Sequence, residues 1–224
     1  MGLPEQAAES EDSEASCSSC SHSHDNIHPD IMLLISPLQG RGLFATAFIP
    51  CGTVVWQNKM DGPMESCYKH YQFSELTSLP EEAMKLITRF GSQLDETTIV
   101  GPSTMEEVEM DDTNFWNHSC DPNTWPMTED CWVTRRDVYP GEEMTIDYIT
   151  FDSNDYSGFS ECRCGTTLCR KRITADDYKI MEVQKRYEGH FVPFIQKKID
   201  AYVLTNQFVG KEDKETELRM VLVN

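Results

Sequence analysis

Short apolar runs separated by turns dominate the first two thirds of the chain. Residues 31–35 are a continuous apolar run bounded by a serine and a proline, which predicts a buried β-strand. Residues 43–45 and 53–56 follow glycine-containing turns and predict two more strands. Residues 97–101 and 131–134 have the same character. This part of the chain is therefore expected to be mostly β.

One segment of this region, residues 78–90, has apolar residues at the spacing of an α-helix. Ser78, an early proline and two acidic residues mark a helix start, with the serine hydroxyl as the expected cap. Apolar residues then recur at helical spacing and predict a packing face. Its members are Ala83, Met84, Ile87 and Phe90.

The end of the chain has a helical pattern. Thr174 and the acidic residues after it predict a helix to about Tyr187. Pro193 predicts the start of a second helix, which runs to about Val203. These helices would either pack on the rest of the protein or form a docking surface. The expected packing face of the second helix is Phe194, Ile195 and Ile199.

Both ends are expected to be disordered. Residues 1–28 are rich in serine and acidic residues and contain no Lys or Arg, and residues 206–224 are charged. The first tail contains Cys17 and Cys20, with histidines close behind. Two cysteines at this spacing beside histidines are typical metal ligands, but the segment lacks the apolar residues that would build a fold around an ion. A solvated tail is the favoured interpretation, with a metal site as the alternative.

Charge and composition narrow the function classes. The 224 residues carry a formal charge of −19, which argues against binding nucleic acid through its phosphates. The acidity suits a basic protein partner, or it only keeps the protein in solution. No apolar run is long enough to cross a bilayer. We expect a soluble intracellular protein, with no preference between nucleus and cytoplasm.

The cysteines indicate a metal site. Nine cysteines without a secretion signal do not suggest a disulfide framework. Cys162, Cys164 and Cys169 place three thiolates within eight residues, and a structural zinc ion needs four ligands. Cys120 is the expected fourth ligand, and Cys131 is its competitor.

Three further motifs could carry chemistry. The Gly40–Gly42 turn allows close approach of the backbone, although a dinucleotide fingerprint would need a third glycine and a long helix. Asn117 and His118 together offer donors and acceptors, and no nucleophile elbow supports a hydrolase. Tyr148 ends a short strand, where its hydroxyl could orient an amine.

Together these pieces resemble the SET-domain protein lysine methyltransferases. The resemblance runs from about residue 31 to 172. It rests on four ordered motifs, Gly40–Ala45, Asn117–Asn123, Arg136–Tyr148 and Cys162-x-Cys164-x4-Cys169.

The resemblance implies a mostly-β (α+β) fold of small curved sheets with a C-terminal pseudoknot and a post-SET zinc cluster, followed by C-terminal helices. The implied divisions are an acidic tail (1–28), a SET domain (29–150), a post-SET zinc motif (151–173), a helical segment (174–205) and a charged tail (206–224).

The resemblance also implies the activity, methyl transfer from S-adenosylmethionine to the side-chain amine of a lysine. The backbone around Arg41 and Gly42 would face the methionine part of the cofactor. Asn117 and His118 would hold its adenine and amino groups, and Tyr148 would be the catalytic tyrosine. Residues 162–168 would add contacts, and zinc would be bound by Cys120, Cys162, Cys164 and Cys169.

The chain departs from the family pattern in two places. Ile146 stands two residues before the tyrosine, where the family usually has an aromatic residue that influences how many methyl groups are added. An isoleucine cannot hydrogen-bond an amine, so the number of methyl groups is not predicted. In the unfamiliar region 57–112, Tyr68 and Tyr71 are the candidates for the second aromatic residue of the lysine channel.

The expected partner is a lysine-containing protein or basic peptide. A histone tail is the first candidate, and a non-histone protein is the second. Neither direct nucleic-acid binding nor membrane association is expected. The alternative function is a non-catalytic, zinc-stabilised module that keeps the fold and binds other proteins.

Overall fold

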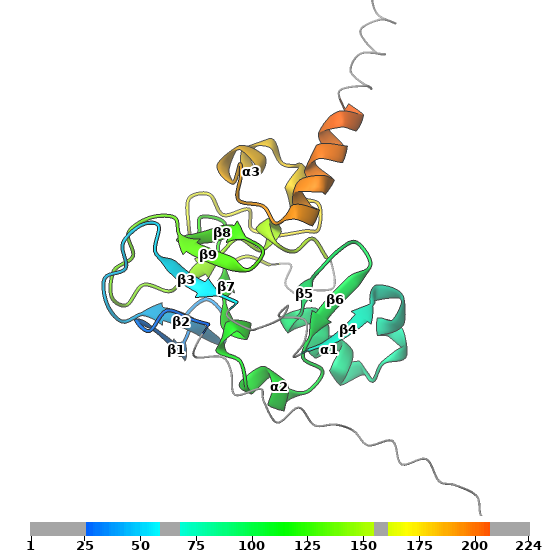
Figure 1. Ribbon diagram of the computed structural model, residues 1–224, viewed down its shortest axis with the longest axis horizontal. Helices are drawn as coiled ribbons and strands as arrows, with labels where there is room; N and C mark the ends of the chain where they lie inside the picture. The colour runs from blue at the N-terminus through cyan, green and yellow to red at the C-terminus, as the bar shows by residue number, and fades with distance from the viewer. Residues whose placement is uncertain (1–25, 59–67, 155–160, 207–224) are drawn as a thin grey trace, which may run out of the picture.

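Three small antiparallel sheets and one short parallel pair form the β structure of the described residues, 26–58, 68–154 and 161–206, in this computed structural model (Figure 1). The first sheet is an antiparallel pair, and the second has the order β3-β9-β8. Their strands are β1 (Ile31–Ile35), β2 (Arg41–Ala45), β3 (Val54–Gln57), β8 (Thr124–Thr128) and β9 (Cys131–Thr134). The predicted strands at 31–35, 43–45, 53–56 and 131–134 are confirmed.

The third sheet forms a separate lobe with the first helix. Its strand order is β4-β6-β5, and a small core centred on Ile87 joins it to α1. The elements are β4 (Lys69–Gln72), the 3-10 helix η2 (Phe73–Ser78), α1 (Glu81–Phe90), β5 (Ser92–Gln93) and β6 (Thr98–Gly101).

A parallel pair closes the fold between two distant segments. β7 (Asn117–His118) lies beside β10 (Thr145–Ile146), with Asn117 opposite Thr145. The backbone N–H of Ser119 extends this pairing by donating to the carbonyl of Ile146 at 3.0 Å. The chain reaches β7 through α2 (Met105–Glu109) and the 3-10 helix η3 (Asp112–Phe115). The pairing of β7 with β10 brings together two segments that are distant in sequence, as a pseudoknot requires.

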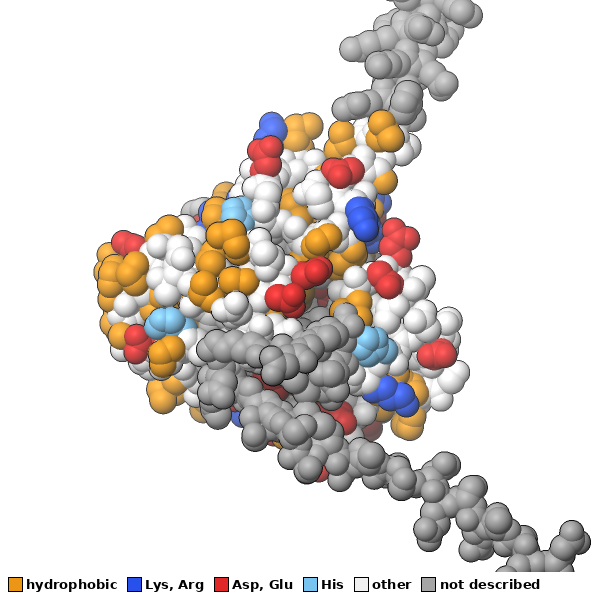
Figure 2. Space-filling model, viewed as in Figure 1, with side chains coloured by type: hydrophobic (Ala, Val, Ile, Leu, Met, Phe, Trp, Pro, Cys, Tyr) orange, Lys and Arg blue, Asp and Glu red, His pale blue; other side chains and the backbone are white. Residues whose placement is uncertain are grey.

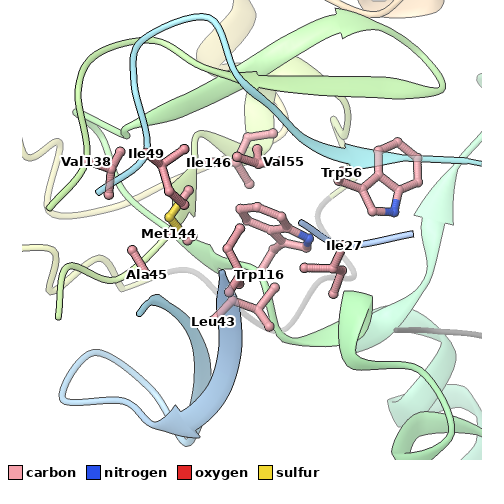
Figure 3. Packing of buried hydrophobic residues seen from close by; sticks show 11 residues of the cluster. Ile27, Leu43, Ala45, Ile49, Val55, Trp56, Trp116, Val138, Met144 and Ile146 are labelled. Carbon is pink, nitrogen blue, oxygen red and sulfur yellow. The ribbon is translucent and has the colours of Figure 1, made fainter. Parts of the chain in front are cut away.

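A hydrophobic core beneath the parallel pair holds it in place. Trp116 lies in the middle of this core, with Leu43, Ile27 and Ile146 around its ring (Figure 3). Leu43 is 1% exposed and Ile146 is 0% exposed, so the strands are fixed by burial of their apolar side chains.

The C-terminal segment covers the chain that leaves the parallel pair. It contains the 3-10 helix η6 (Asp177–Lys179), the helix α3 (Met181–Arg186) and a helix over residues 193–206. A second core joins this segment to Ile149, which lies in the 3-10 helix η4 (Tyr148–Thr150). The helical segment therefore packs on the rest of the protein, with Ile195 fully buried at the contact.

Three local expectations are corrected. β1 is a strand, but only Ile31 in it is buried. Met32 and Leu34 are 51% and 45% exposed on the face that meets solvent, and Ile35 is 87% exposed at the end of the strand. Ser78 does not cap α1, whose N-cap is Pro80 without a side-chain hydrogen bond. The single helix expected from Thr174 to Tyr187 is broken at Ile180, where η6 ends and α3 begins.

The surface reflects the acidic composition. Acidic side chains lie among apolar and neutral ones on the face shown in Figure 2, and basic side chains are fewer. Within the described ranges, no helix has both the length and the apolar character that a membrane span needs. The cysteines and histidines of residues 17–24 lie outside the described residues.

Candidate functional site

The parallel pair brings Asn117 and His118 beside Tyr148. The backbone N–H of Tyr148 donates to His118 Nδ1 at 3.3 Å, and the two rings meet edge to face with centroids 5.2 Å apart. An adjacent pair of residues and a tyrosine 30 positions after His118 thus share one location. The sequence alone did not predict that Asn117, His118 and Tyr148 lie together; this expectation came from the family resemblance.

The Tyr148 hydroxyl is fixed by the backbone. It donates to the carbonyl oxygen of Trp116 at 2.8 Å, so its oxygen lone pairs are left to face a ligand. Burial, followed by the nearby carboxylate of Asp152, raises the pKa of Tyr148 above its usual value. The phenol is therefore neutral and can orient an amine or accept a weak C–H···O contact.

The glycine turn packs directly against Asn117. Asn117 Nδ2 donates to the carbonyl of Arg41 at 2.9 Å and to the Glu143 carboxylate at 2.6 Å. A Cβ at Gly42 would collide with the carboxylate of Glu143 and lie 2.8 Å from Asn117 Nδ2. Glycine is favoured here, because a Cβ would force the Glu143 and Asn117 side chains out of the positions in which they bond to each other.

A cavity of about 490 Å³ opens beside these residues. Arg41 and Asn117 lie on its wall together with Tyr148 and Trp116. This volume is within the range of small-molecule sites. The cavity also contains Tyr68, whose hydroxyl donates to Asp111 at 3.1 Å.

Of the remaining positions named from the sequence, Tyr68 lines the cavity, whereas Tyr71 and Ile146 do not. Tyr71 belongs to the core of the third sheet and is 5% exposed, so of the two candidate tyrosines only Tyr68 reaches the cavity wall. Ile146 is in the main core and is absent from the cavity lining. Ile146 therefore contributes to the packing of the core and not to the cavity wall.

His118 is buried and is not part of the cavity lining. Its side chain is 0% exposed, and its Nε2 is 3.3 Å from Cys120 Sγ. Because Nδ1 accepts the N–H of Tyr148, the proton of a neutral ring sits on Nε2 and points to the sulfur. Burial lowers the pKa of His118 to about 4. His118 thus connects the tyrosine segment to a cysteine cluster.

Four thiols form that cluster. The sulfur atoms of Cys120, Cys162, Cys164 and Cys169 all lie within 4.8 Å of one another, and Cys131 is not among them. Tetrahedral coordination at about 2.3 Å places sulfurs about 3.8 Å apart, so the four positions fit a closed metal site. Burial raises the pKa of Cys120 to about 11, so a thiolate at this position requires a cation.

A buried ionic network joins this cluster to the tyrosine segment. The guanidinium of Arg170 donates to both oxygens of Asp147 at 2.6 and 2.7 Å, and to Asp177 at 2.6 Å. The Tyr187 hydroxyl donates to Asp147 at 3.0 Å. Sequence reasoning missed these residues, because their partners are 7 to 40 positions apart and follow no local spacing.

The comparisons with known proteins agree with this geometry. Residues 40–149 match the family model of the SET domain. This match identifies a SET domain in the chain, and the matched residues begin at the glycine turn and end one residue after Tyr148.

Two curated relatives are similar over part of that domain. Both are named "Histone-lysine N-methyltransferase Su(var)3-9", one from Drosophila melanogaster and one from Drosophila pseudoobscura pseudoobscura. They are 38% and 35% identical over 79 residues, which cover 26% of this chain and 12% of each relative. The matched part is thus a small fraction of two much longer proteins.

Proposed function

We propose that the protein transfers a methyl group from S-adenosylmethionine to the side-chain amine of a lysine in a protein substrate. The observation that carries the proposal is the convergence of Arg41, Asn117 and Tyr148 on one cavity, with Gly42 packed against Asn117 behind its wall. The SET domain and the names of the relatives support lysine methylation in general. The donor and the acceptor are our inference.

The cavity suits the proposed donor. Asn117 and the backbone around Arg41 and Gly42 would hold its polar groups, with His118 contributing through the segment that carries it. The bound donor supplies an electrophilic methyl group. A site of this kind gains most of its rate from alignment, since the amine must attack in line with the departing sulfur.

Tyr148 is the proposed catalytic residue. Its hydroxyl is held by the Trp116 carbonyl at 2.8 Å, so the oxygen has a fixed position before a ligand arrives. It would orient the lone pair of the amine and attract the polarised methyl group through a C–H···O contact. The apolar rings on the cavity wall favour the neutral amine, which is the nucleophilic form.

Zinc is the proposed ion of the cysteine cluster. Four thiolates in tetrahedral positions are a common zinc ligand set, and the ion would make thiolates favourable at buried positions. The site would join Cys120, which directly follows the β7 segment, to the cysteines after residue 161. The metal is thus proposed to brace the pocket without taking part in the reaction.

The acceptor is proposed to be a lysine in a histone tail. Both relatives are named as histone-lysine methyltransferases, and a chain with a formal charge of −19 would attract a basic tail. A nuclear location would follow from such a substrate. A lysine in a non-histone protein would leave the proposed reaction unchanged.

The test is a transfer assay with methyl-labelled S-adenosylmethionine, core histones and a cell lysate as acceptors. Mass spectrometry would locate the methylated lysine. The proposal expects label on lysine in the wild type and a loss of about a hundredfold or more in kcat for Tyr148→Phe. Absence of both transfer and saturable cofactor binding in the zinc-replete protein would instead indicate a non-catalytic protein-binding module. Equal rates for the two proteins would refute the role of Tyr148.

A further inference from the structure

The cavity has a second wall that lies beyond the SET match. Phe151 and Asp152 follow Tyr148, and the C-terminal segment brings Val192 and Phe194 to the same cavity. The wall is fixed by two backbone hydrogen bonds: Asp152 N–H to the Tyr148 carbonyl at 2.7 Å, and Val192 N–H to the Thr150 carbonyl at 2.9 Å. The SET match ends at residue 149, so none of these wall residues is covered by it.

Asp152 is a carboxylate on this apolar wall. One oxygen accepts the backbone N–H of Asn154 at 2.9 Å, and the side-chain amide of Asn154 is 3.5 Å from the other. Among the described residues, no cation lies within ion-pair distance of it. Lys198 faces it from the helix over residues 193–206, but its Nζ donates to Ser153 Oγ at 2.8 Å.

The other charged groups on the cavity are engaged elsewhere or lie on a different element. Arg41 pairs with Glu109, and Lys85 of α1 pairs with two glutamates of its own helix. The Arg89 guanidinium lies 5.1 Å from the centre of the Phe90 ring. Glu129, in the turn between β8 and β9, adds a second negative charge to the cavity lining. Asp152 is the carboxylate that immediately follows the Tyr148 turn.

We propose that Asp152 binds the ammonium group of the acceptor lysine as it enters the cavity, while Phe151, Val192 and Phe194 pack against the methylene groups of that lysine. This inference rests on the proposed function. A lysine side chain has an apolar stem and a cationic end, and the wall offers apolar rings followed by a carboxylate. A free lysine is protonated at neutral pH, so the ammonium is the form that arrives.

Two observations support this assignment. Burial raises the pKa of Asp152 to about 7, and an ammonium partner would offset the cost of the ionised form. Asp152 is also held in the same turn as Tyr148, because its backbone N–H donates to the Tyr148 carbonyl at 2.7 Å, and both residues line the cavity. A lysine captured by Asp152 would therefore be adjacent to the reaction position.

The test compares Asp152→Asn with Asp95→Asn. Asparagine keeps the oxygen that accepts the N–H two residues later, so it removes the charge and retains the turn. Asp95 is a matched control, because it accepts the N–H of Thr97 in the same way at 2.7 Å and lies outside the cavity lining. Transfer to purified core histones gives KM and kcat, and calorimetry gives the affinity for S-adenosylmethionine.

The expected result for Asp152→Asn is a rise of about tenfold in the KM for histones, with kcat within about twofold of the wild type. Asp95→Asn should match the wild type, and Asp152→Glu should recover part of the loss. An unchanged KM, or a loss confined to cofactor affinity, would refute the inference while wild-type transfer stands. Absence of transfer in the wild type would refute the proposed function and this inference with it.

Discussion

Removal of the Arg170 guanidinium should destabilise the protein strongly. Arg170 makes three charge-assisted hydrogen bonds to two carboxylates, and the Asp147 side chain is 0% exposed. In Arg170→Gln these carboxylates would lose their shared cation in a buried site. Removing one partner of a buried ion pair costs about 3–5 kcal/mol, so we expect a loss of that size in the free energy of unfolding.

Urea unfolding followed by circular dichroism, at fixed zinc concentration, measures this loss. Arg163→Gln is the matched control, because Arg163 lies in the same segment and pairs with Glu161 in an exposed ion pair at 2.8 Å. The control should unfold like the wild type, since exposed pairs contribute little. Arg170→Lys should fall between wild type and Arg170→Gln, because a lysine keeps the charge but cannot bond both oxygens in the planar geometry of a guanidinium.

The reasoning would be refuted by a loss below about 1 kcal/mol in Arg170→Gln, which is the range of a surface pair. An equal loss in Arg163→Gln would contradict it as well, because the effect would then not depend on burial. A further consequence concerns activity. Asp147 directly precedes Tyr148, so methyl transfer should fall more than the folded fraction does.

Three further predictions concern the metal, the substrate wall and pH. Cys120→Ser should lower the zinc content below one ion per chain and reduce stability, as measured by elemental analysis and thermal melting. Phe194→Ala should raise the KM for histones about tenfold, whereas Phe191→Ala, outside the cavity lining, should leave it unchanged. Burial raises the carboxyl pKa of Asp152 to about 7, so ionisation disfavours the folded state. As the pH rises from about 4 to 7, the wild type should lose about 3 kcal/mol of unfolding free energy relative to Asp152→Asn in urea titrations.

The thiol cluster and most strands could be predicted from the sequence. Cys162, Cys164 and Cys169 have ligand spacing, which is a local signal, and the thiol cluster with Cys120 agrees with that expectation. Apolar runs bounded by turns located the strands, because strand formation depends on local pattern. Burial depends on what covers each face, so the exposure of Ile35 could not be predicted from β1 alone.

The ionic network and the second cavity wall could not be predicted. Arg170 and Asp147 are 23 positions apart, and their pairing depends on the parallel strand pair and the cysteine cluster together. Asp152 gives no local signal either, since an aspartate in a turn usually faces water. Its proposed role in binding the lysine depends on the cavity that it lines together with Phe194, which comes from the helix over residues 193–206.

The central claim is that the cavity beside Gly42 and Tyr148 binds the methyl donor. Calorimetric titration of S-adenosylmethionine into the zinc-replete protein tests this claim directly, with Gly42→Ala as the comparison. We expect saturable binding at one molecule per chain, and a large loss of affinity in Gly42→Ala, whose Cβ would displace Glu143 and Asn117. No saturable binding by the wild type, or equal affinity in the two proteins, would contradict the account.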